Sequence, residues 1–465
     1  MPDASHYDLV IIGAGPAGEK AAAQAGYFGK RVLVVEAESE PGGAAVHTGT
    51  LPSKTLRETA LYLSGHRARE LYGVAVELDH GATLQHLMSR KDAIASAESR
   101  SFRANFSRHK VDYAHGIGRF ADPHTVDISS SEGVRRVTAD YILITTGSKP
   151  HRPKDIDFGD AWIHDSDEIL DIETLPTSMT ILGGGVIGCE YACMFAALGV
   201  KITLVDARPE ILPFLDLEII RRLRDAMSHL GIELVQGRRW LHVRRMEEGV
   251  ETELSDGTLL GSQQLLFAAG RTGASSGLDL AKAGLEADSR GYIPVDAQFR
   301  TKVPHILAAG DIIGFPALAS VSMAQGRVAV CHAFGFTYKQ TVASAMPYGI
   351  YTIPEVSSFG ETEESCKEKG LDYVAGRALY ADNPRGKITG DLEGITKLVV
   401  DKKTRKLLGV HVIGERASEL VHIGQVVIIL GGTVDVFIDM VFNYPTLADS
   451  YKYAAYACLA ELAKP

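Results

Sequence analysis

Two glycine-rich stretches decide the fold of this chain: Gly13-Ala14-Gly15-Pro16-Ala17-Gly18 and Gly183-Gly184-Gly185-Val186-Ile187-Gly188, which begin 170 residues apart. Each follows a short apolar run, Leu9–Ile12 in the first case and Thr180–Leu182 in the second. Each also opens a stretch rich in small residues that predicts a helix. The pattern predicts the same strand–turn–helix unit twice.

The glycines and the acids that follow them have separate expected roles. In such a turn, glycines permit a tight bend, let backbone N–H groups approach a pyrophosphate and let the helix close onto the sheet. A second apolar run follows each helix and ends in an acid, Glu36 or Asp206, which is placed to bind ribose hydroxyls. The expected pyrophosphate sites are Gly13, Gly15 and Gly18, and Gly183, Gly185 and Gly188. Two complete units predict that the chain binds two dinucleotides, for which the simplest chemistry is hydride transfer.

The bulk composition fits a globular α/β enzyme. The chain has 465 residues, of which 45% are hydrophobic and 47 are glycine, and this length predicts about three domains. A formal net charge of −10 without a Lys/Arg block argues against a nucleic-acid partner. No apolar run approaches the ~18 residues of a membrane-spanning helix, and the first one is a predicted strand, not a signal peptide. We therefore expect a soluble, cytoplasmic protein without a membrane partner.

The order of patterns along the chain predicts an internal duplication and a separate C-terminal domain. Residues 61–110 have a helical pattern, and residues 111–145 have the pattern of short strands. Apolar runs that end near Gly147 and Gly270 mark equivalent points of two Rossmann-type domains, and an α+β pattern begins beyond Pro347. The expected domain limits are residues 1–149 with 272–345, residues 150–271, and residues 346–465.

The cysteines and histidines indicate neither disulfides nor a metal site. The five cysteines are Cys189, Cys193, Cys331, Cys366 and Cys458. An odd, scattered set predicts free thiols. Cys189 and Cys193 could share one helix face, but free cysteine mostly behaves as a small buried hydrophobe. The histidines lack metal-ligand spacing, His47 has no evident partner, and we expect no metal.

Three further phrases lie in a specific order along the chain: Gly42–Lys54, Thr145-Thr146-Gly147 and Ala309-Gly310-Asp311. With both glycine turns, they make the chain resemble the pyridine nucleotide–disulfide oxidoreductases over essentially its whole length. The resemblance implies one non-covalent FAD at the first turn, a nicotinamide nucleotide at the second, and a homodimer or larger homo-oligomer formed through the C-terminal domain. It also implies FAD contacts from Gly43, Gly147, Gly310 and Asp311, a helix from about Ala319 aimed at the flavin, and a nicotinamide nucleotide contact from Gly270.

The chain departs from the dithiol members of this family at four positions. By resemblance, their two redox cysteines correspond to Ala45 and Thr50, and their C-terminal His–Glu pair corresponds to Tyr444 and Asp449. A flavin–disulfide relay requires a thiolate next to the ring and a base for its proton. Because both are missing, dithiol chemistry is excluded, and electrons that enter the flavin must also leave from it.

Within this superfamily, four phrases are most similar to the soluble (Si-specific) pyridine nucleotide transhydrogenases: His47–Lys54, Tyr348–Glu355, Gly414–Gln425 and Phe442–Thr446. The similarity implies FAD-dependent hydride transfer between NADPH and NAD⁺, in ping-pong order through flavin N5. One alternative is an NAD(P)H:quinone or acceptor reductase on the same scaffold. Another is a flavoprotein that senses NAD(P)H.

The resemblance also implies the residues next to the reacting atoms. Lys54 and Glu190 would pair near flavin N5, so that the carboxylate keeps the ammonium charged in a partly buried site. A purely structural ion pair is the alternative. Thr50 would hydrogen-bond near the ring, although a hydroxyl on a helix face is an equally good interpretation.

Asp206 and Arg208 are expected to select the nicotinamide nucleotide. Asp206 favours the ribose hydroxyls of NAD and repels a 2′-phosphate, whereas Arg208 can bind that phosphate in a bidentate manner. We favour use of both NAD and NADP, although a strict NAD enzyme with a solvated Arg208 would show the same pair. Ala274 stands where relatives tend to carry Asn, without a clear consequence.

Overall fold

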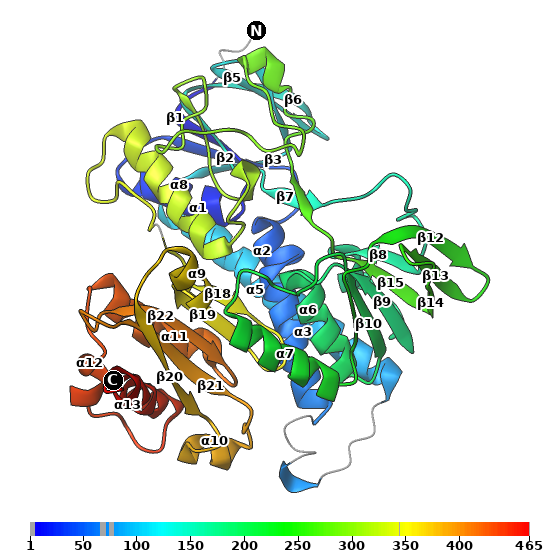
Figure 1. The fold of residues 1–465 in the computed structure, drawn as a ribbon. Coiled ribbons are helices and arrows are strands. Elements are labelled where there is room, and N and C mark those ends of the chain that lie inside the picture. The colour runs from blue at the N-terminus through cyan, green and yellow to red at the C-terminus, as the bar shows by residue number, and fades with distance from the viewer. Residues whose placement is uncertain (1–4, 66–70, 74–78, 344, 465) are drawn as a thin grey trace. The chain divides into compact units, whose positions relative to one another are not determined.

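The computed structural model describes residues 5–65, 71–73, 79–343 and 345–464, and the chain divides into two compact units (Figure 1). The first unit comprises residues 1–55, 88–151 and 270–343, and the second comprises residues 56–87, 152–269 and 344–465. Helix α5 (His80–Arg108) occupies much of the helical region predicted over residues 61–110, and α3 (Thr50–Leu63) reaches only its first residues. Predicted helical residues 66–70 and 74–78 lie outside the described residues. The finer domain limits stay a prediction.

The first unit is built on a sheet with the strand order β3-β2-β1-β6-β5-β4. Its strands are β1 (Ser5–Ile12), β2 (Val32–Glu36), β3 (Asp112–His115), β4 (Ile117–Asp122), β5 (Thr125–Ser130) and β6 (Gly133–Ile144). The central strand β1 runs parallel to β2 and to β6. A late segment, β17 (Ile306–Ala308), pairs in parallel with the end of β6 and so completes this sheet.

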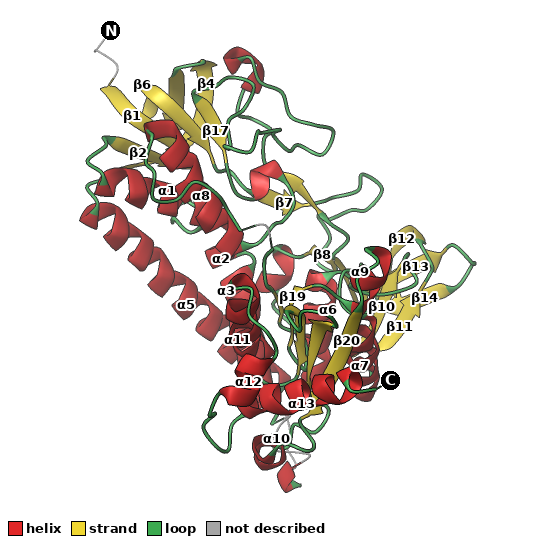
Figure 2. Cartoon of the chain, turned by 60° about the vertical axis from the view of Figure 1, so that its left-hand side comes forward, coloured by secondary structure: helices red, strands yellow, loops and turns green. Residues whose placement is uncertain are grey.

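Both faces of β1 are buried. Leu9 and Ile11 pack with alanines of α1 (Pro16–Tyr27), whereas Val10 and Ile12 pack into a separate core with Phe120. Figures 1 and 2 show α1 beside α8 (Ala319–Phe334), in agreement with their close contact. Burial on both faces explains why this strand is a continuous apolar run. The unit also contains the short helix α2 (Gly43–His47) and the antiparallel pair β7 (Ser148–Pro150) and β16 (Arg271–Gly273).

The second unit repeats the strand–turn–helix pattern and adds a second sheet type. Its parallel sheet has the order β11-β10-β9-β15-β8, formed by β8 (Ile163–Asp165), β9 (Ser178–Leu182), β10 (Lys201–Asp206), β11 (Glu233–Gln236) and β15 (Gln264–Phe267). Helix α6 (Val186–Ala197) connects β9 to β10, and α7 (Leu217–His229) connects β10 to β11. A three-stranded antiparallel sheet, β12 (Trp240–Met246), β13 (Gly249–Leu254) and β14 (Leu259–Ser262), precedes β15.

The C-terminal part of the second unit has an antiparallel sheet, as the change in pattern beyond Pro347 predicts. Its strands are β18 (Tyr348–Ile350), β19 (Val356–Gly360), β20 (Tyr373–Leu379), β21 (Ile395–Asp401) and β22 (Leu407–Ile413), in the order β18-β19-β22-β21-β20. Helices α11 (Ala417–Ile429) and α13 (Ser450–Leu462) pack on it around a core that includes Val410 and Tyr451. The shorter helices are α9 (Glu363–Glu368), α10 (Pro384–Thr389) and α12 (Asp435–Asp439).

These elements confirm the predicted α/β fold class with two dinucleotide-binding sheets and an α+β C-terminal part. Within the ranges given above, no helix is both long enough and apolar enough to span a membrane.

Candidate functional site

The first glycine turn joins β1 to α1 in a form that only glycine allows. Gly13 has a φ of +106°, and a Cβ there would lie 2.5 Å from the Thr145 carbonyl oxygen. A Cβ at Gly18 would overlap the Gly13 carbonyl oxygen, so the helix packs directly against the turn. Gly15 is the N-cap residue of α1, and no side-chain hydrogen bond caps this helix. The positive N-terminus of α1 is therefore available to bind an anionic ligand. A pyrophosphate site requires such a free helix N-terminus.

Glu36 is buried at the end of β2 and supports this turn. Its carboxylate accepts a hydrogen bond from the Ala14 backbone N–H at 2.6 Å and one from the Glu38 backbone N–H at 3.0 Å. The acid thereby ties the second strand to the glycine turn. Its expected contact with a ribose stays a prediction.

Among the other predicted FAD contacts, Gly310 and Asp311 follow β17, whereas Gly43 lies next to Gly15 of the first glycine turn. The Asp311 carboxylate accepts hydrogen bonds from the Ser148 hydroxyl at 2.9 Å and the Ser322 hydroxyl at 3.3 Å. Ser322 lies in α8, whose N-terminus has no side-chain cap. Positive φ values of +56°, +72° and +83° occur at Gly43, Gly147 and Gly310. The helix N-termini of α1 and α8, which have no side-chain caps, and the Asp311 carboxylate give the first unit the donors and the acceptor that fit an FAD.

The segment that carries redox cysteines in dithiol relatives has none here. Ala45 lies in α2, and Thr50 is the exposed first residue of α3. Lys54 lies in α3, where its Nζ donates to the Ser53 hydroxyl at 3.3 Å. His47 does have partners that the sequence did not reveal: its Nε2 lies 3.1 Å from the Pro41 carbonyl oxygen and 3.3 Å from the Ser99 hydroxyl.

All five cysteines are free and buried, which confirms the expectation of free thiols. Burial raises the pKa of the Cys193 and Cys458 thiols to about 12 and that of Cys366 to about 11. Burial also raises the pKa of Cys189 well above its ordinary value. Because the thiolate is the reactive species, these four side chains are poor nucleophiles at neutral pH.

The second glycine turn repeats the geometry of the first. Gly183 has a φ of +116°, and a Cβ there would lie 2.7 Å from the Ala268 carbonyl oxygen. A Cβ at Gly188 would overlap the Gly183 carbonyl oxygen, whereas at Gly185 it would meet no atom within 4 Å. Gly185 is the N-cap residue of α6, again without a side-chain cap. Gly270 has a φ of +115°. This turn fits a nicotinamide nucleotide as the first fits FAD.

Asp206 and Arg208 form an ion pair at the end of β10. Arg208 donates from Nε to Asp206 Oδ1 at 2.9 Å and from Nη2 to Oδ2 at 2.7 Å. The Gly184 backbone N–H also donates to Asp206, at 2.5 Å. Burial favours the neutral acid, but these hydrogen bonds hold the pKa of Asp206 below its ordinary value. Arg208 is therefore paired with the neighbouring acid while its side chain stays 47% exposed, and the choice between NAD and NADP stays a prediction.

Glu190 lies on α6 and is only 7% exposed. Its carboxylate accepts a hydrogen bond at 2.9 Å from the backbone N–H of Tyr351, between β18 and β19. The sequence analysis missed this contact, although Tyr351 belongs to a phrase that carried the family resemblance. The predicted pairing of Glu190 with Lys54 would join the two units and stays a prediction.

The residues at the positions of the C-terminal His–Glu pair have different surroundings. Tyr444 is 72% exposed, whereas Asp449 is buried just before α13. Among the described residues, no group of three or more His, Cys, Asp or Glu side chains is arranged to hold a metal ion.

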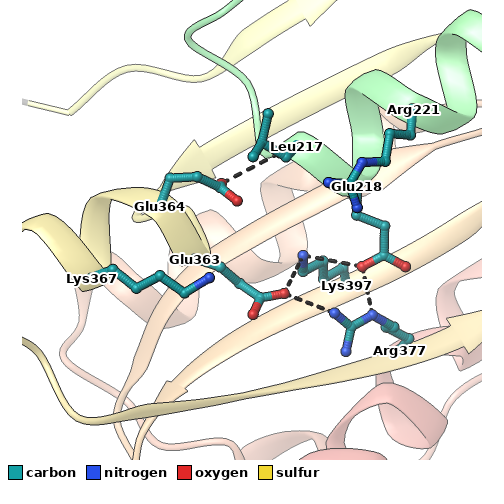
Figure 3. A pocket seen from close by; sticks show the side chains of 8 residues that line it. All are labelled: Leu217, Glu218, Arg221, Glu363, Glu364, Lys367, Arg377 and Lys397. Carbon is teal, nitrogen blue, oxygen red and sulfur yellow. Dashed lines mark hydrogen bonds and ion pairs between the residues drawn. The ribbon is translucent and has the colours of Figure 1, made fainter.

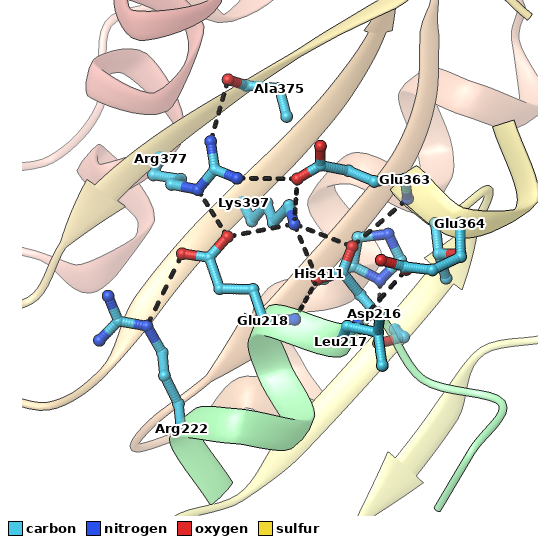
Figure 4. A network of polar contacts seen from close by, with 12 residues as sticks. Asp216, Leu217, Glu218, Arg222, Glu363, Glu364, Ala375, Arg377, Lys397 and His411 are labelled. Atoms are coloured by element: carbon cyan, nitrogen blue, oxygen red, sulfur yellow. Dashed lines mark hydrogen bonds and ion pairs between the residues drawn. The ribbon is translucent and has the colours of Figure 1, made fainter. Parts of the chain in front are cut away.

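A cavity of about 420 Å³ in the second unit has a different character from the glycine turns (Figure 3). It is lined by Leu217, Glu218, Arg221, Glu363, Glu364, Lys367, Arg377 and Lys397. Of these lining residues, Lys397 has a side chain that is only 1% exposed. Its Nζ lies 2.7 Å from Asp216 and 2.6 Å from Glu363 (Figure 4). Arg377 bonds to both Glu218 and Glu363. We call Asp216, Glu218, Glu363, Arg377 and Lys397 the Lys397 clasp.

The Lys397 clasp joins α7 to the C-terminal sheet. Asp216 caps α7 by accepting from the Glu218 backbone N–H at 3.0 Å, and Glu364 of α9 accepts from the Leu217 N–H at 3.3 Å. The carboxylates lie at the N-termini of two helices, where negative charge is stabilised. Because these polar side chains are hydrogen-bonded to one another, we interpret the cavity as part of the packing interface between α7 and the C-terminal sheet. We do not interpret it as a catalytic site.

Comparison with known proteins matches residues 7–326 to the pyridine nucleotide-disulphide oxidoreductase family and residues 346–455 to its dimerisation domain. A soluble pyridine nucleotide transhydrogenase from Mycobacterium bovis is 45% identical over 451 residues, which cover 97% of this chain and 96% of the relative. Another, from Colwellia psychrerythraea, is 38% identical over 460 residues, with 98% of each chain covered.

Solved structures show the same fold. A Cu(II) complex of the HOCl-induced flavoprotein disulfide reductase RclA from Escherichia coli has a TM-score of 0.88 at 26% identity, covering 97% of this chain and 99% of that one. LpdA from Mycobacterium tuberculosis has a TM-score of 0.88 at 27% identity, with the same coverage. The predicted resemblance is confirmed, and with it the use of FAD and nicotinamide nucleotides. This chain is an oxidoreductase that belongs to the pyridine nucleotide-disulphide oxidoreductase family.

Proposed function

We propose that this enzyme transfers hydride between NADPH and NAD⁺ in ping-pong order, without a redox disulfide. The observation that carries the proposal is the absence of sulfur at Ala45 and Thr50, together with the burial of all five cysteines. A dithiol substrate needs an accessible thiolate as exchange partner. The soluble transhydrogenases at 37–45% identity favour nicotinamide nucleotides as both donor and acceptor.

Bound FAD supplies an atom, flavin N5, that can accept hydride from one nucleotide and return it to the next. The first unit binds the FAD pyrophosphate at the α1 N-terminus, while Glu36 and Asp311 accept hydrogen bonds from its sugar hydroxyls. The remaining contacts come from the backbone at Gly43, Gly147 and Gly310. These assignments rest on the uncapped helix and the close-packed turn described above.

Both nicotinamide nucleotides use the second turn in succession. Gly183, Gly185 and Gly188 place the α6 N-terminus against the pyrophosphate, with Gly270 at the rim. Asp206 accepts from the ribose hydroxyls of NAD, and Arg208 leaves Asp206 to bind the 2′-phosphate of NADP. The exposure of Arg208 beside the buried Asp206 supports this proposal, because Arg208 can leave the pair without moving the acid.

Lys54, Glu190 and Thr50 act next to the reacting ring. Lys54 would place its side-chain amine beside flavin N5, where the Glu190 carboxylate would pair with it. Thr50 donates a hydrogen bond from the position of a family cysteine. The burial of Glu190 supports this assignment, since a buried carboxylate requires fixed partners.

The domains follow from the same proposal. Residues 1–149 and 272–345 bind FAD, residues 150–271 bind NAD(P), and residues 346–465 form the interface of a homodimer. The match of residues 346–455 to a dimerisation domain supports the last of these assignments.

An anaerobic assay with two acceptors tests the reaction. The enzyme is mixed with NADPH and an NAD⁺ analogue of distinct absorbance, and then with a quinone in place of the analogue. We expect analogue reduction with parallel-line steady-state kinetics and much slower quinone reduction. Fast quinone reduction without analogue reduction would show an acceptor reductase, and flavin reduction without transfer to either acceptor would favour a sensor.

A further inference from the structure

Arg57 is a buried cation that neither the glycine turns nor the Lys397 clasp explains. It lies on α3, and its side chain is 5% exposed. Removing a guanidinium from water is costly unless its donors are paired. Its partners therefore show what this residue holds in place.

Two of its nitrogen atoms bind one backbone carbonyl. Nε donates to the Thr352 carbonyl oxygen at 3.0 Å, and Nη2 donates to the same oxygen at 2.8 Å. Nη1 donates to Glu58, and it lies 3.4 Å from Glu355 Oε1. The planar guanidinium thus fixes one peptide oxygen in both distance and direction.

The carbonyl belongs to residues 351–355, which connect β18 to β19 and which we call the 351–355 segment. Thr352 is fully buried, and its hydroxyl donates to the Pro354 carbonyl oxygen at 2.7 Å. Glu355 accepts from the Ser418 hydroxyl, in the first turn of α11, at 2.9 Å. The later half of the segment is therefore held by Arg57 and α11 together.

The first residue of the segment holds Glu190. The Tyr351 backbone N–H donates to Glu190 Oε1 at 2.9 Å. One helical turn further along α6, the Cys193 thiol lies 4.0 Å from the Ile353 carbonyl oxygen. The 351–355 segment thus lies between Arg57 and the helix that carries Glu190.

We propose that Arg57 is a positioning residue for hydride transfer. By fixing the Thr352 carbonyl, it holds the neighbouring Tyr351 N–H against Glu190 and so orients the carboxylate that acts next to the flavin. This inference rests on the role proposed above for Glu190. Without Arg57, the 351–355 segment loses the guanidinium that fixes the Thr352 carbonyl, and the Tyr351 N–H that donates to Glu190 is held less firmly.

Amide hydrogen exchange tests the positional part without turnover. We compare Arg57→Met, which keeps the apolar stem, with Arg57→Gln and Arg57→Lys. Exchange of the Tyr351 and Thr352 amides should accelerate about tenfold or more in the Met and Gln variants, because local opening becomes easier. Arg57→Lys should recover part of the protection by donating to the same carbonyl.

The matched control is Arg377→Met. Among the described residues, the hydrogen bonds of Arg377 go to two carboxylates of the second unit, Glu218 and Glu363, and to the Ala375 carbonyl, and not to the 351–355 segment. The Arg377→Met variant should leave amide hydrogen exchange in the 351–355 segment unchanged. Unchanged protection in both Arg57→Met and Arg57→Gln overturns the proposal, as does equal loss in Arg377→Met.

Stopped-flow reduction of the flavin by NADH tests the functional part. In Arg57→Met, the limiting rate should fall about 10- to 100-fold, because the reacting groups are misaligned. The apparent Kd for NADH should stay unchanged, since the second glycine turn is intact in this variant. In a Glu190→Ala background, Arg57→Met should change the rate less than about twofold, because no carboxylate remains to be oriented. Equal losses in both backgrounds would show a merely structural role.

Flavin reduction by NADH distinguishes failure of the transhydrogenase proposal from failure of the positioning proposal for Arg57. If NADPH never reduces an NAD⁺ analogue but the Arg57 variants lose flavin reduction as described, the transhydrogenase proposal fails and the positioning role stands. If transhydrogenation proceeds and the Arg57 variants reduce flavin at the normal rate, only the positioning role fails.

Discussion

At the scale of single residues, the proposed function assigns the choice of nucleotide to the ion pair between Asp206 and Arg208 at the end of β10. Arg208 is 47% exposed on its side chain, whereas Asp206 is buried. The arginine can therefore swing outward, while the acid cannot. A ribose with free hydroxyls needs Asp206, and a 2′-phosphate needs Arg208.

Replacing each partner should shift nucleotide preference in opposite directions. Asp206→Ala releases Arg208 and removes a repulsive charge, so the ratio of kcat/KM for NADPH to that for NADH should rise about tenfold, equivalent to ~1.4 kcal/mol. Arg208→Ala should lower the ratio by a similar factor. Steady-state kinetics with both nucleotides measure this. Unchanged ratios in both variants would place the adenosine ribose elsewhere.

The cysteines allow a second test at this scale. Because burial raises the pKa of Cys193 and Cys458 to about 12, almost no thiolate of either is present at pH 8. Iodoacetamide at this pH should leave turnover unchanged, and reduced flavin should show no thiolate charge-transfer band. A thiol reagent should titrate all five cysteines only after denaturation. Activity loss that parallels alkylation would contradict the proposed route for electrons.

At the scale of elements, glycines of one turn serve two purposes that mutation can separate. Gly188 lets α6 pack on the turn, whereas Gly185 has a negative φ and open space around its position. Gly188 is needed for the fold, and the proposed function requires Gly185 to leave room for a ligand.

Alanine at these two positions should have different effects. Gly188→Ala should destabilise the second unit by about 3 kcal/mol, because its Cβ overlaps a carbonyl oxygen. Gly185→Ala should keep the melting temperature within about 2 °C, which corresponds to less than ~1 kcal/mol, and should raise KM for both nucleotides. Calorimetry and steady-state kinetics distinguish these outcomes. A Gly185→Ala enzyme with normal KM would show that no pyrophosphate approaches this position.

The Lys397 clasp sets the pH range over which α7 stays attached to the C-terminal sheet. Burial acts against both charges, yet Lys397 lowers the pKa of Glu363, and, together with His411, that of Asp216. In turn, Asp216 and Glu363 raise the pKa of Lys397 against the effect of burial. The acids stabilise the fold above their unfolded pKa of roughly 4, and this stabilisation is lost as pH falls through the lower folded values. The lysine contributes fully below roughly pH 10.4, and its contribution is lost at higher pH.

Lys397→Met should therefore destabilise the protein by about 3–5 kcal/mol at pH 7, because Asp216 is left as an uncompensated buried charge. The difference from the wild type should shrink below roughly pH 4, where the acids take up protons. Asp216→Asn combined with Lys397→Met should recover part of the loss. Denaturant unfolding across this pH range is the measurement, and a pH-independent difference would contradict the assignment.

At the scale of the whole molecule, the C-terminal part carries several exposed apolar side chains. Side chains at the end of α11 and in the segment after α12 are largely exposed, including Leu430 at 78% and Val441 at 93%. Exposed apolar side chains are common at interaction sites, and the match to a dimerisation domain supports the homodimer proposed above.

A charge in this surface should separate the copies. Leu430→Glu with Val441→Glu should convert a dimer to a monomer, because an unpaired charge inside an interface is costly. Light scattering coupled to size exclusion reports the mass. Substituting the exposed Tyr62 of the same unit provides the control, and a monomeric wild type would contradict the interface assignment.

The sequence alone predicted the features that depend on neighbours along the chain. Strands β1, β2, β9 and β10 and the two glycine turns follow from apolar runs, glycine spacing and the acids that end each run, because a strand–turn–helix unit is specified locally. The missing sulfur at Ala45 and Thr50 is likewise a fact of the sequence.

Only the tertiary structure decided which distant groups share a partner. Arg57 meets Thr352, Tyr351 meets Glu190 and Lys397 meets Asp216 across separations of 161 to 295 residues. No periodicity encodes such contacts, because a buried charge or amide is satisfied by whichever element the fold packs against it. The glycine turns are thus determined locally, and the contacts of Glu190 and Lys397 depend on the packing of the whole second unit.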